Sequence, residues 1–266
     1  MIRIVTVSLV ILCLAVVMTM TGRGGGNFYV LVLVLAGCPM HEAATSGQFI
    51  LFTTAFAAML IFQRHGVVEW RLVVGIGSLA AMAAFAGGYL SAYVAGRMLK
   101  FVFSALLVIA AFLMVTPVKK KPVTETSSRG QWRLRTPEGQ FIVNLWISIP
   151  ITLATGFGAG MVGVSGGSFL VPLMVLACSV PMPLAVGTAS AMVGSTALMG
   201  FLGHLSQGHF DAAWALPFAC AAIIGGILGS RFALKTKPER LKMLFAYTTL
   251  AAAIVMAINA FVSHAG

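Results

Sequence analysis

Apolar residues occupy the chain in ten separate runs, divided by short segments rich in glycine, proline and charge. The runs span 4–20, 28–38, 43–62, 72–95, 101–115, 141–160, 169–178, 184–202, 212–234 and 243–262. Most of them approach the roughly 20 residues that a helix needs to cross a bilayer, but the second and the seventh reach only about half of that length. The pattern predicts an all-α integral membrane protein with about 8–10 transmembrane helices.

Two glycine-rich segments interrupt the apolar sequence just before the two short runs. The first covers residues 21–27 and the second covers residues 158–168. Glycine weakens a helix and accepts left-handed backbone, so each segment predicts a broken helix. Inside a membrane, non-helical backbone is tolerated only where protein buries it or where it lines a wet cavity. Two such breaks at corresponding places indicate the binding site of a transporter.

The two halves of the chain repeat each other at a spacing of about 142 positions. Matching pairs include Pro39 with Pro181, Gly66 with Gly208, Glu69 with Asp211, and Leu99 with Leu241. We therefore predict a first membrane repeat over 1–115, a flexible basic connector over 116–140 and a second membrane repeat over 141–266. Since each repeat would hold five crossing segments, an odd number, the two repeats are expected to be inverted relative to each other.

The distribution of charged residues predicts how the chain is oriented in the membrane. Only 9% of the residues are charged, against about 25% in a soluble domain, and the net charge of +11 comes from short segments between apolar runs. Such basic residues set membrane topology, so nucleic-acid binding is not expected. If all ten runs cross the membrane, most of the basic residues lie on the same face as the connector. We expect that face to be cytoplasmic in a bacterial inner membrane, with both termini outside.

Two motifs in the second half resemble the sulfite exporter TauE/SafE family of membrane transporters. They are Gly163-Val164-Ser165-Gly166-Gly167-Ser168-Phe169-Leu170-Val171-Pro172 and Ala185-Val186-Gly187-Thr188-Ala189-Ser190. The resemblance covers nearly the whole chain and implies transport of sulfite, sulfonates or related sulfur-containing anions. The first half departs from the pattern, because Arg23 stands where the second half has Val164 and no proline corresponds to Pro172. These departures leave the exact substrate open.

The polar residues of both breaks suit an anion. Backbone N–H groups at the start of a helix attract negative charge, and Asn27 and Ser168 are residue types that begin helices well. We expect substrate contacts from Gly25, Gly26, Asn27, Thr45, Ser46, Gln48, Ser165, Gly166, Gly167, Ser168, Thr188 and Ser190. The alternative for each hydroxyl is a bond to a carbonyl of its own helix.

Arg23 is the sharpest single candidate for substrate binding. A guanidinium inside the first break could hold an oxyanion with its fork of donors. The alternative is that its long side chain reaches the cytoplasmic interface.

Two further pairs are candidates for coupling or for the transport pathway. Glu42, beside His41, could carry a coupling proton if it is buried, and a solvated turn is the alternative. Cys38 and Cys178 hold nearly equivalent positions and could engage a sulfur-bearing substrate, although a small buried hydrophobe is the plainer interpretation. His204 and His209 are expected at the interface. The glycines at 87–88 and 225–229 are expected to let helices pack closely.

The leading hypothesis is a secondary transporter of a small sulfur-containing anion that works by alternating access, and the alternative is an anion channel. An enzyme is not expected, since the few acidic residues form no catalytic or metal-binding cluster, and no cofactor is expected. A membrane potential that is negative inside favours anion exit by about 2.3 kcal/mol per charge per 100 mV, which favours export. The coupling ion, proton or sodium, and the oligomeric state stay open.

Overall fold

The computed structural model describes residues 2–94, 98, 131–136, 139–164, 166–178, 180–208, 210–241, 243–244 and 247–248. The first half contains α1 (Ile2–Met20), α2 (Gly26–Leu35), α3 (Met40–Arg64), α4 (Trp70–Leu72), the π-helical η1 (Val73–Gly77), α5 (Ser78–Leu90) and the 3₁₀ turn η2 (Ser91–Tyr93). The second contains β1 (Gln131–Thr136), β2 (Gly139–Asn144), α7 (Leu145–Val162), α8 (Gly167–Pro172), the π-helical η3 (Leu173–Ala177), α9 (Met182–Leu205) and α10 (Ala212–Lys235). The predicted run 101–115 and most of 243–262 lie outside the described residues.

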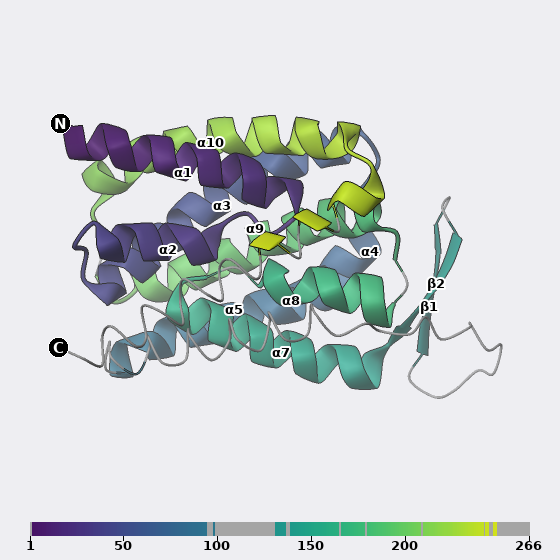
Figure 1. Ribbon diagram of the computed structural model, residues 1–266. Coiled ribbons are helices and arrows are strands. Elements are labelled where there is room, and N and C mark those ends of the chain that lie inside the picture. Colours follow the sequence, from purple (N-terminus) through teal and green to yellow (C-terminus); the bar gives the residue numbers. More distant parts are fainter. Residues whose placement is uncertain are drawn as a thin grey trace.

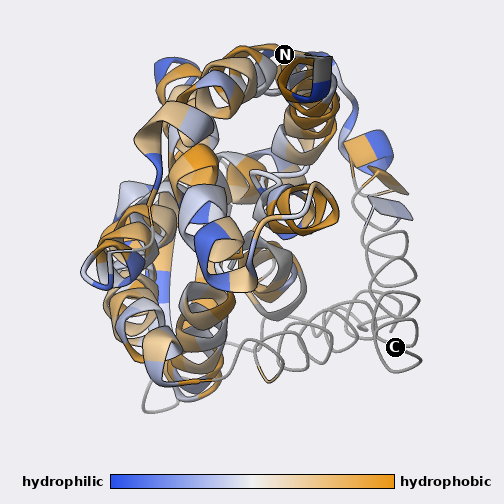
Figure 2. Ribbon diagram, turned by 90° about the vertical axis from the view of Figure 1, so that its left-hand side faces the viewer, coloured by the Kyte–Doolittle hydropathy of each residue, from blue (hydrophilic) through white to orange (hydrophobic). Residues whose placement is uncertain are grey.

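The predicted class is confirmed. Among the described residues, 6 helical spans are long and apolar enough to cross a membrane: Arg3–Met20, Met40–Arg64, Trp70–Tyr93, Leu145–Val162, Met182–Leu205 and Ala212–Lys235. Hydrophobic residues recur along all of these helices (Figure 2), and many large ones face outward, including Leu9, Val74, Met82 and Leu216. Outward apolar side chains suit lipid contact, so the chain is an integral membrane protein.

The same helices recur in the same order in both halves (Figure 1). A long helix leads through a glycine break into a short helical segment, and a second long helix then begins directly after a proline, Pro39 or Pro181. A glycine with positive φ follows that helix, Gly66 or Gly208, and an acidic residue begins the next span. The short segments therefore lie where the short apolar runs predict them.

Helix packing also pairs the two halves. Helix α3 packs on α9, α1 on α10 and α5 on α7, while α10 also packs on α3 and α5 on α9. Exchanging the halves returns the same set: the α3–α9 contact maps onto itself, and the other four contacts interchange in two pairs. The core consequently forms between the halves rather than within each one.

Close approaches at glycines give the directions of these helices. Gly194 of α9 lies near Ala55 of α3, whereas Gly200, further along α9, meets the earlier Gln48. Helices α3 and α9 are therefore antiparallel. The corresponding contacts make α1 parallel to α10 and α5 parallel to α7. These are the directions that two inverted repeats would produce, and the inverted repeat itself stays a prediction.

The glycines expected to mediate packing do so. A Cβ at Gly87 would lie 2.8 Å from the backbone nitrogen of Met161 in α7, and one at Gly225 would lie 2.7 Å from the carbonyl oxygen of Leu12 in α1. The second break is shorter than the glycine pattern suggests. Helix α7 continues to Val162, so Gly158 and Gly160 belong to the helix. Gly160 serves contact with α5, because the backbone of Ala84 lies against it.

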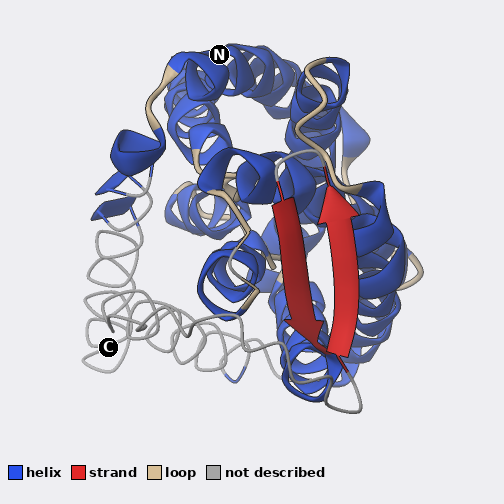
Figure 3. Cartoon of the chain, turned by 90° about the vertical axis from the view of Figure 1, so that its right-hand side faces the viewer, coloured by secondary structure: helices blue, strands red, loops and turns tan. Residues whose placement is uncertain are grey.

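A β-hairpin occupies the end of the segment that we expect to be a flexible connector (Figure 3). Strands β1 and β2 pair antiparallel, and β2 takes residues 139–144, which the sequence assigns partly to the first helix of the second half. Leu134, Phe141 and Val143 are buried beside Leu72 and Ile76. The hairpin is thus anchored to one end of the helix bundle by apolar burial. Residues 116–130 lie outside the described residues.

Asp211 caps the start of α10, where its carboxylate accepts bonds from the backbone nitrogens of Ala213 (3.0 Å) and Trp214 (3.3 Å). Replacing it with alanine leaves both donors without this partner and is expected to reduce the unfolding free energy by about 1 kcal/mol. Thermal unfolding in detergent would measure the change. Asp211→Asn is the matched control, since the amide oxygen keeps the acceptor. Equal melting temperatures for wild type and Asp211→Ala would contradict the capping role.

Candidate functional site

The two glycine breaks meet in the middle of the helix bundle. A Cβ at Gly24 would lie 3.2 Å from the Cγ1 atom of Val193, and one at Gly167 would lie 2.8 Å from its Cγ2 atom. Val193 stands at the centre of α9, and the same Cβ at Gly167 would lie 2.9 Å from the Cα atom of Arg23. The sequence predicts that both breaks serve one site, and the structure brings them into contact.

Backbone conformation explains why glycines fill the first break. Gly22, Gly24 and Gly25 have φ angles of 74°, 69° and 92°, a region that other residues rarely adopt. Space is also limiting, because a Cβ at Gly22 would lie 2.8 Å from the carbonyl oxygen of Val186. The chain can therefore turn sharply at mid-depth and begin α2 inside the bundle.

Both short helices begin two residues earlier than the expected caps at Asn27 and Ser168 would place them. Gly25 and Gly166 take the capping positions, and neither Asn27 nor Ser168 does. Gly25, Gly26, Asn27, Gly166 and Gly167 are all buried. Ser165 lies outside the described residues, and Ser168 is placed only as a backbone position in the first turn of α8. The first-turn N–H groups of α2 and α8 thus start from the central junction.

Arg23 lies inside the protein, with 2% of its surface exposed. Its Nη1 atom donates to the hydroxyl of Thr248 at 3.3 Å. The interfacial alternative for Arg23 is therefore wrong, because the side chain does not extend to the surface. A buried cation in a chain that spans a membrane is rare and typical of a functional site.

Most of the expected hydroxyl ligands bond to the protein itself. Thr45 donates to the carbonyl of His41 at 2.9 Å, and Ser190 donates to that of Val186 at 3.0 Å, so both follow the back-bonding alternative. Thr188 accepts from the backbone nitrogen of Glu69 at 2.9 Å and fixes the start of α4. Ser46 is buried on α3. These contacts give the hydroxyls a structural role in this conformation.

Gln48 is the best placed polar side chain of α3. It is 1% exposed, and its Nε2 atom donates to the carbonyl of Ala159 at 3.3 Å. Its Oε1 atom has no hydrogen-bond partner among the described residues. A buried acceptor without a partner is costly, so this amide has capacity for a further bond near the second break.

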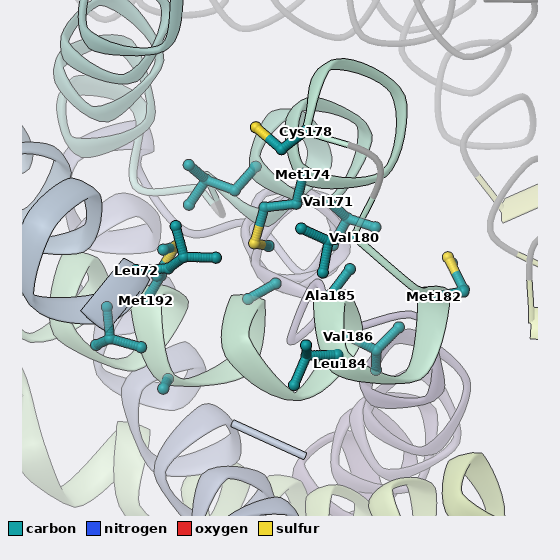
Figure 4. Packing of buried hydrophobic residues seen from close by; sticks show 14 of the residues in the cluster. Leu72, Val171, Met174, Cys178, Val180, Met182, Leu184, Ala185, Val186 and Met192 are labelled. Carbon is teal, nitrogen blue, oxygen red and sulfur yellow. The ribbon is translucent and has the colours of Figure 1, made fainter. Parts of the chain in front are cut away.

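The pathway candidates lie away from this junction. Glu42 is exposed and His41 is half-buried in the first turn of α3, which agrees with a solvated turn. Cys38 precedes them, and burial together with the charge of Glu42 raises the pKa of its thiol, which Arg3 opposes. Cys178 instead belongs to an apolar cluster with Met174, Val180 and other residues (Figure 4). The two cysteines occupy separate clusters and do not form a pair.

The sequence interpretation missed His204. It is 3% exposed, and its Nε2 atom lies 2.8 Å from the carbonyl oxygen of Gly160 in α7. Its Nδ1 atom lies 3.0 Å from the hydroxyl of Ser91, next to the end of α5. The expectation of an interfacial residue did not include this burial, which arises because α5 and α7 pack against the last turn of α9 at Gly88 and Gly160. His209 lies outside the described residues.

Comparison with known proteins gives a consistent result. The profile of the family described as "Sulfite exporter TauE/SafE" matches residues 7–256. "Probable membrane transporter protein YunE" of Bacillus subtilis (strain 168) is 24% identical over 211 residues, covering 77% of this chain and 76% of the relative. A "Probable membrane transporter protein" of Xylella fastidiosa (strain 9a5c) is 23% identical, covering 85% and 83%. No solved structure matches the chain significantly.

Proposed function

Because this chain belongs to the sulfite exporter TauE/SafE family and is a membrane transporter, we propose that it carries a small sulfur-containing anion such as sulfite or an organosulfonate. The proposed route is alternating access between the two halves, with the glycine junction as the binding site. The relatives are named as transporters, which supports transport as the activity.

The observation that carries the proposal is the buried Arg23, whose backbone lies against the start of α8 and precedes the start of α2 by three residues. Sulfite and sulfonate groups present several negatively charged oxygens on one sulfur atom. A guanidinium donates to such oxygens through its fork, and the first N–H groups of a helix add donors with a favourable dipole. The site therefore combines a fixed positive charge with directional donors for an oxyanion.

Position within the bundle favours a carrier over a channel. The junction lies against the centre of α9 and is closed in this conformation, since Arg23, Asn27 and Gln48 are all buried. A channel with the same anion site is the alternative function, and it would need a continuous open path. We place the basic end of the bundle, with Arg64, Arg71 and the hairpin, at the cytoplasmic face of a bacterial inner membrane and expect export.

Purified protein in detergent is expected to unfold at a higher temperature when sulfite or methanesulfonate is added, since a ligand that binds only the folded state stabilises it by mass action. At a concentration about 100 times the Kd, the gain is about 2.7 kcal/mol. Chloride, phosphate and acetate at equal ionic strength serve as controls.

Counterflow of ³⁵S-labelled sulfite in proteoliposomes then separates the two transport modes. A carrier accumulates label transiently against an excess of unlabelled sulfite, whereas a channel only equilibrates it. Equal stabilisation by every anion, together with no sulfite flux, would refute the proposed substrate class.

A further inference from the structure

We propose that His204 is the proton-binding residue that couples anion movement to a proton gradient. This inference rests on the proposed function, and it names the coupling ion. His204 lies near the end of α9, buried among α5, α7 and η2, and two residues before the exposed Ser206. Three connected polar contacts among the described residues, those of His204 with Gly160 and Ser91 and that of Ser91 with Gly88, bear on where protons can sit.

The contacts of the ring can be made with one ring proton or with two, and the two arrangements differ in where the hydroxyl of Ser91 donates. The carbonyl of Gly160 can only accept, so the Nε2 atom must donate to it. Ser91 donates its single proton to the carbonyl of Gly88 at 2.6 Å. Its oxygen then faces the Nδ1 atom of His204 as an acceptor, at 3.0 Å. A second ring proton fills that bond.

Loss of the second proton forces a rearrangement. A neutral ring that keeps Nε2–H presents a bare Nδ1 atom to Ser91. The hydroxyl of Ser91 can then turn to that atom, and it leaves the carbonyl of Gly88 when it does so. Since Gly88 lies in the last turn of α5, proton binding and release change the bonding of that helix end.

Two helix ends supply the electrostatic environment. Helices α5 and α7 are parallel, and their carboxyl ends both reach His204, through Gly88 and Gly160. The carboxyl end of a helix carries partial negative charge and stabilises a nearby imidazolium. No titratable residue occurs in the sequence of α7, while α5 and η2 contribute Tyr89 and Tyr93. The start of α3, which packs antiparallel on α9, brings His41 and Glu42 to the same end.

The same helix end connects the proton site to the anion site. Gln48 binds the carbonyl of Ala159, and His204 binds that of the next residue, Gly160. Three residues later Gly163, with a φ angle of 82°, starts the second break. A change in the bond at Gly160 is therefore positioned to move the backbone that leads to Gly167 and the central junction.

His204→Gln tests the coupling, because glutamine can donate to Gly160 and accept near Ser91 but cannot titrate. Wild-type proteoliposomes are expected to accumulate ³⁵S-labelled sulfite when a pH gradient is imposed, and the variant is expected to lose this accumulation. Exchange of labelled sulfite at equal pH on both sides should stay within about threefold, since exchange needs no net proton movement. His65→Gln, at an exposed histidine at the end of α3, is the matched control and should behave as wild type.

Each outcome separates the two proposals. Absence of exchange in the wild type would refute the proposed substrate and leave His204 to be tested by its own titration, followed by NMR of ring-¹⁵N-labelled protein. The role of His204 would be overturned if His204→Gln exchanges sulfite and also accumulates it in a pH gradient as the wild type does. It would equally be overturned if the wild type exchanges sulfite but the pH gradient drives no accumulation. If His204→Gln does not fold, Ser91→Ala replaces it. Loss of the acceptor should shift the pH dependence of accumulation to lower pH, and an unchanged dependence would overturn the inference.

Discussion

An Arg23→Gln variant is expected to bind sulfite about 100-fold more weakly than the wild type while remaining folded. A hydrogen bond between a charged donor and an anion contributes about 1.5–3 kcal/mol, and a tenfold change in Kd corresponds to about 1.4 kcal/mol. Glutamine keeps a donor for the hydroxyl of Thr248, which Arg23 contacts at 3.3 Å, but it removes the positive charge. The loss should therefore fall on the ligand rather than on the fold.

Titration of the melting temperature with sulfite would measure this change for the wild type and the variant. Arg71→Gln makes the same substitution at an exposed arginine and should leave sulfite binding unchanged. Arg23→Lys keeps a charge without the fork and is expected to give an intermediate affinity. Full sulfite binding by Arg23→Gln would place the anion away from the first glycine break.

A Gly160→Ala variant is expected to lose about 3 kcal/mol of unfolding free energy, because it adds a methyl group where two helix backbones touch. The new Cβ would lie 2.6 Å from the Cα atom of Ala84 in α5 and would also meet that residue's carbonyl oxygen. Both groups belong to backbone, which cannot rotate away as a flexible side chain can. Helices α5 and α7 would have to separate.

Gly194→Ala is the control for this prediction. Gly194 is also buried within a helix, but the nearest atom to its Cβ is the Cβ atom of Ala55 at 3.8 Å, an ordinary contact. Alanine there should be neutral or stabilising by up to about 1 kcal/mol through helix propensity. Thermal unfolding of both variants would measure the difference. Equal stability would show that α5 and α7 have room that the structure does not indicate.

Much of the architecture follows from the pattern of apolar runs and glycines. Glycine clusters predict the broken helices because few other residues tolerate the backbone at Gly22, Gly24 and Gly25. Length alone distinguishes the short helical segments from the long ones. The hairpin was missed although its signal is present. Trp132 and Leu134 alternate with polar residues, but the run that follows Phe141 is apolar enough to be assigned to a helix.

The sequence predicts where the helices break, but it does not predict the surroundings of the polar side chains near the breaks. The sequence places Arg23 in the first glycine break. Its burial could not be predicted, because it depends on how the two breaks pack on Val193. For Thr45 and Ser190, residue type cannot tell whether a hydroxyl bonds to its own helix or to a ligand, because both choices differ only by a rotamer. His204 was missed since its partners, Gly160 and Ser91, lie far from it in sequence.

The packing of α1 against α10 also constrains how the protein is made. Synthesis delivers α1 (Ile2–Met20) to the membrane well before α10 (Ala212–Lys235), which is its main partner among the described helices. The small-residue face of α10, with Gly225 and Gly229, reaches α1 only after nearly all other helices have been synthesised. Until then, lipid covers the surface of α1 that later packs on α10. Assembly of the bundle is therefore a late event, during which a translocon or a membrane chaperone would have to hold α1.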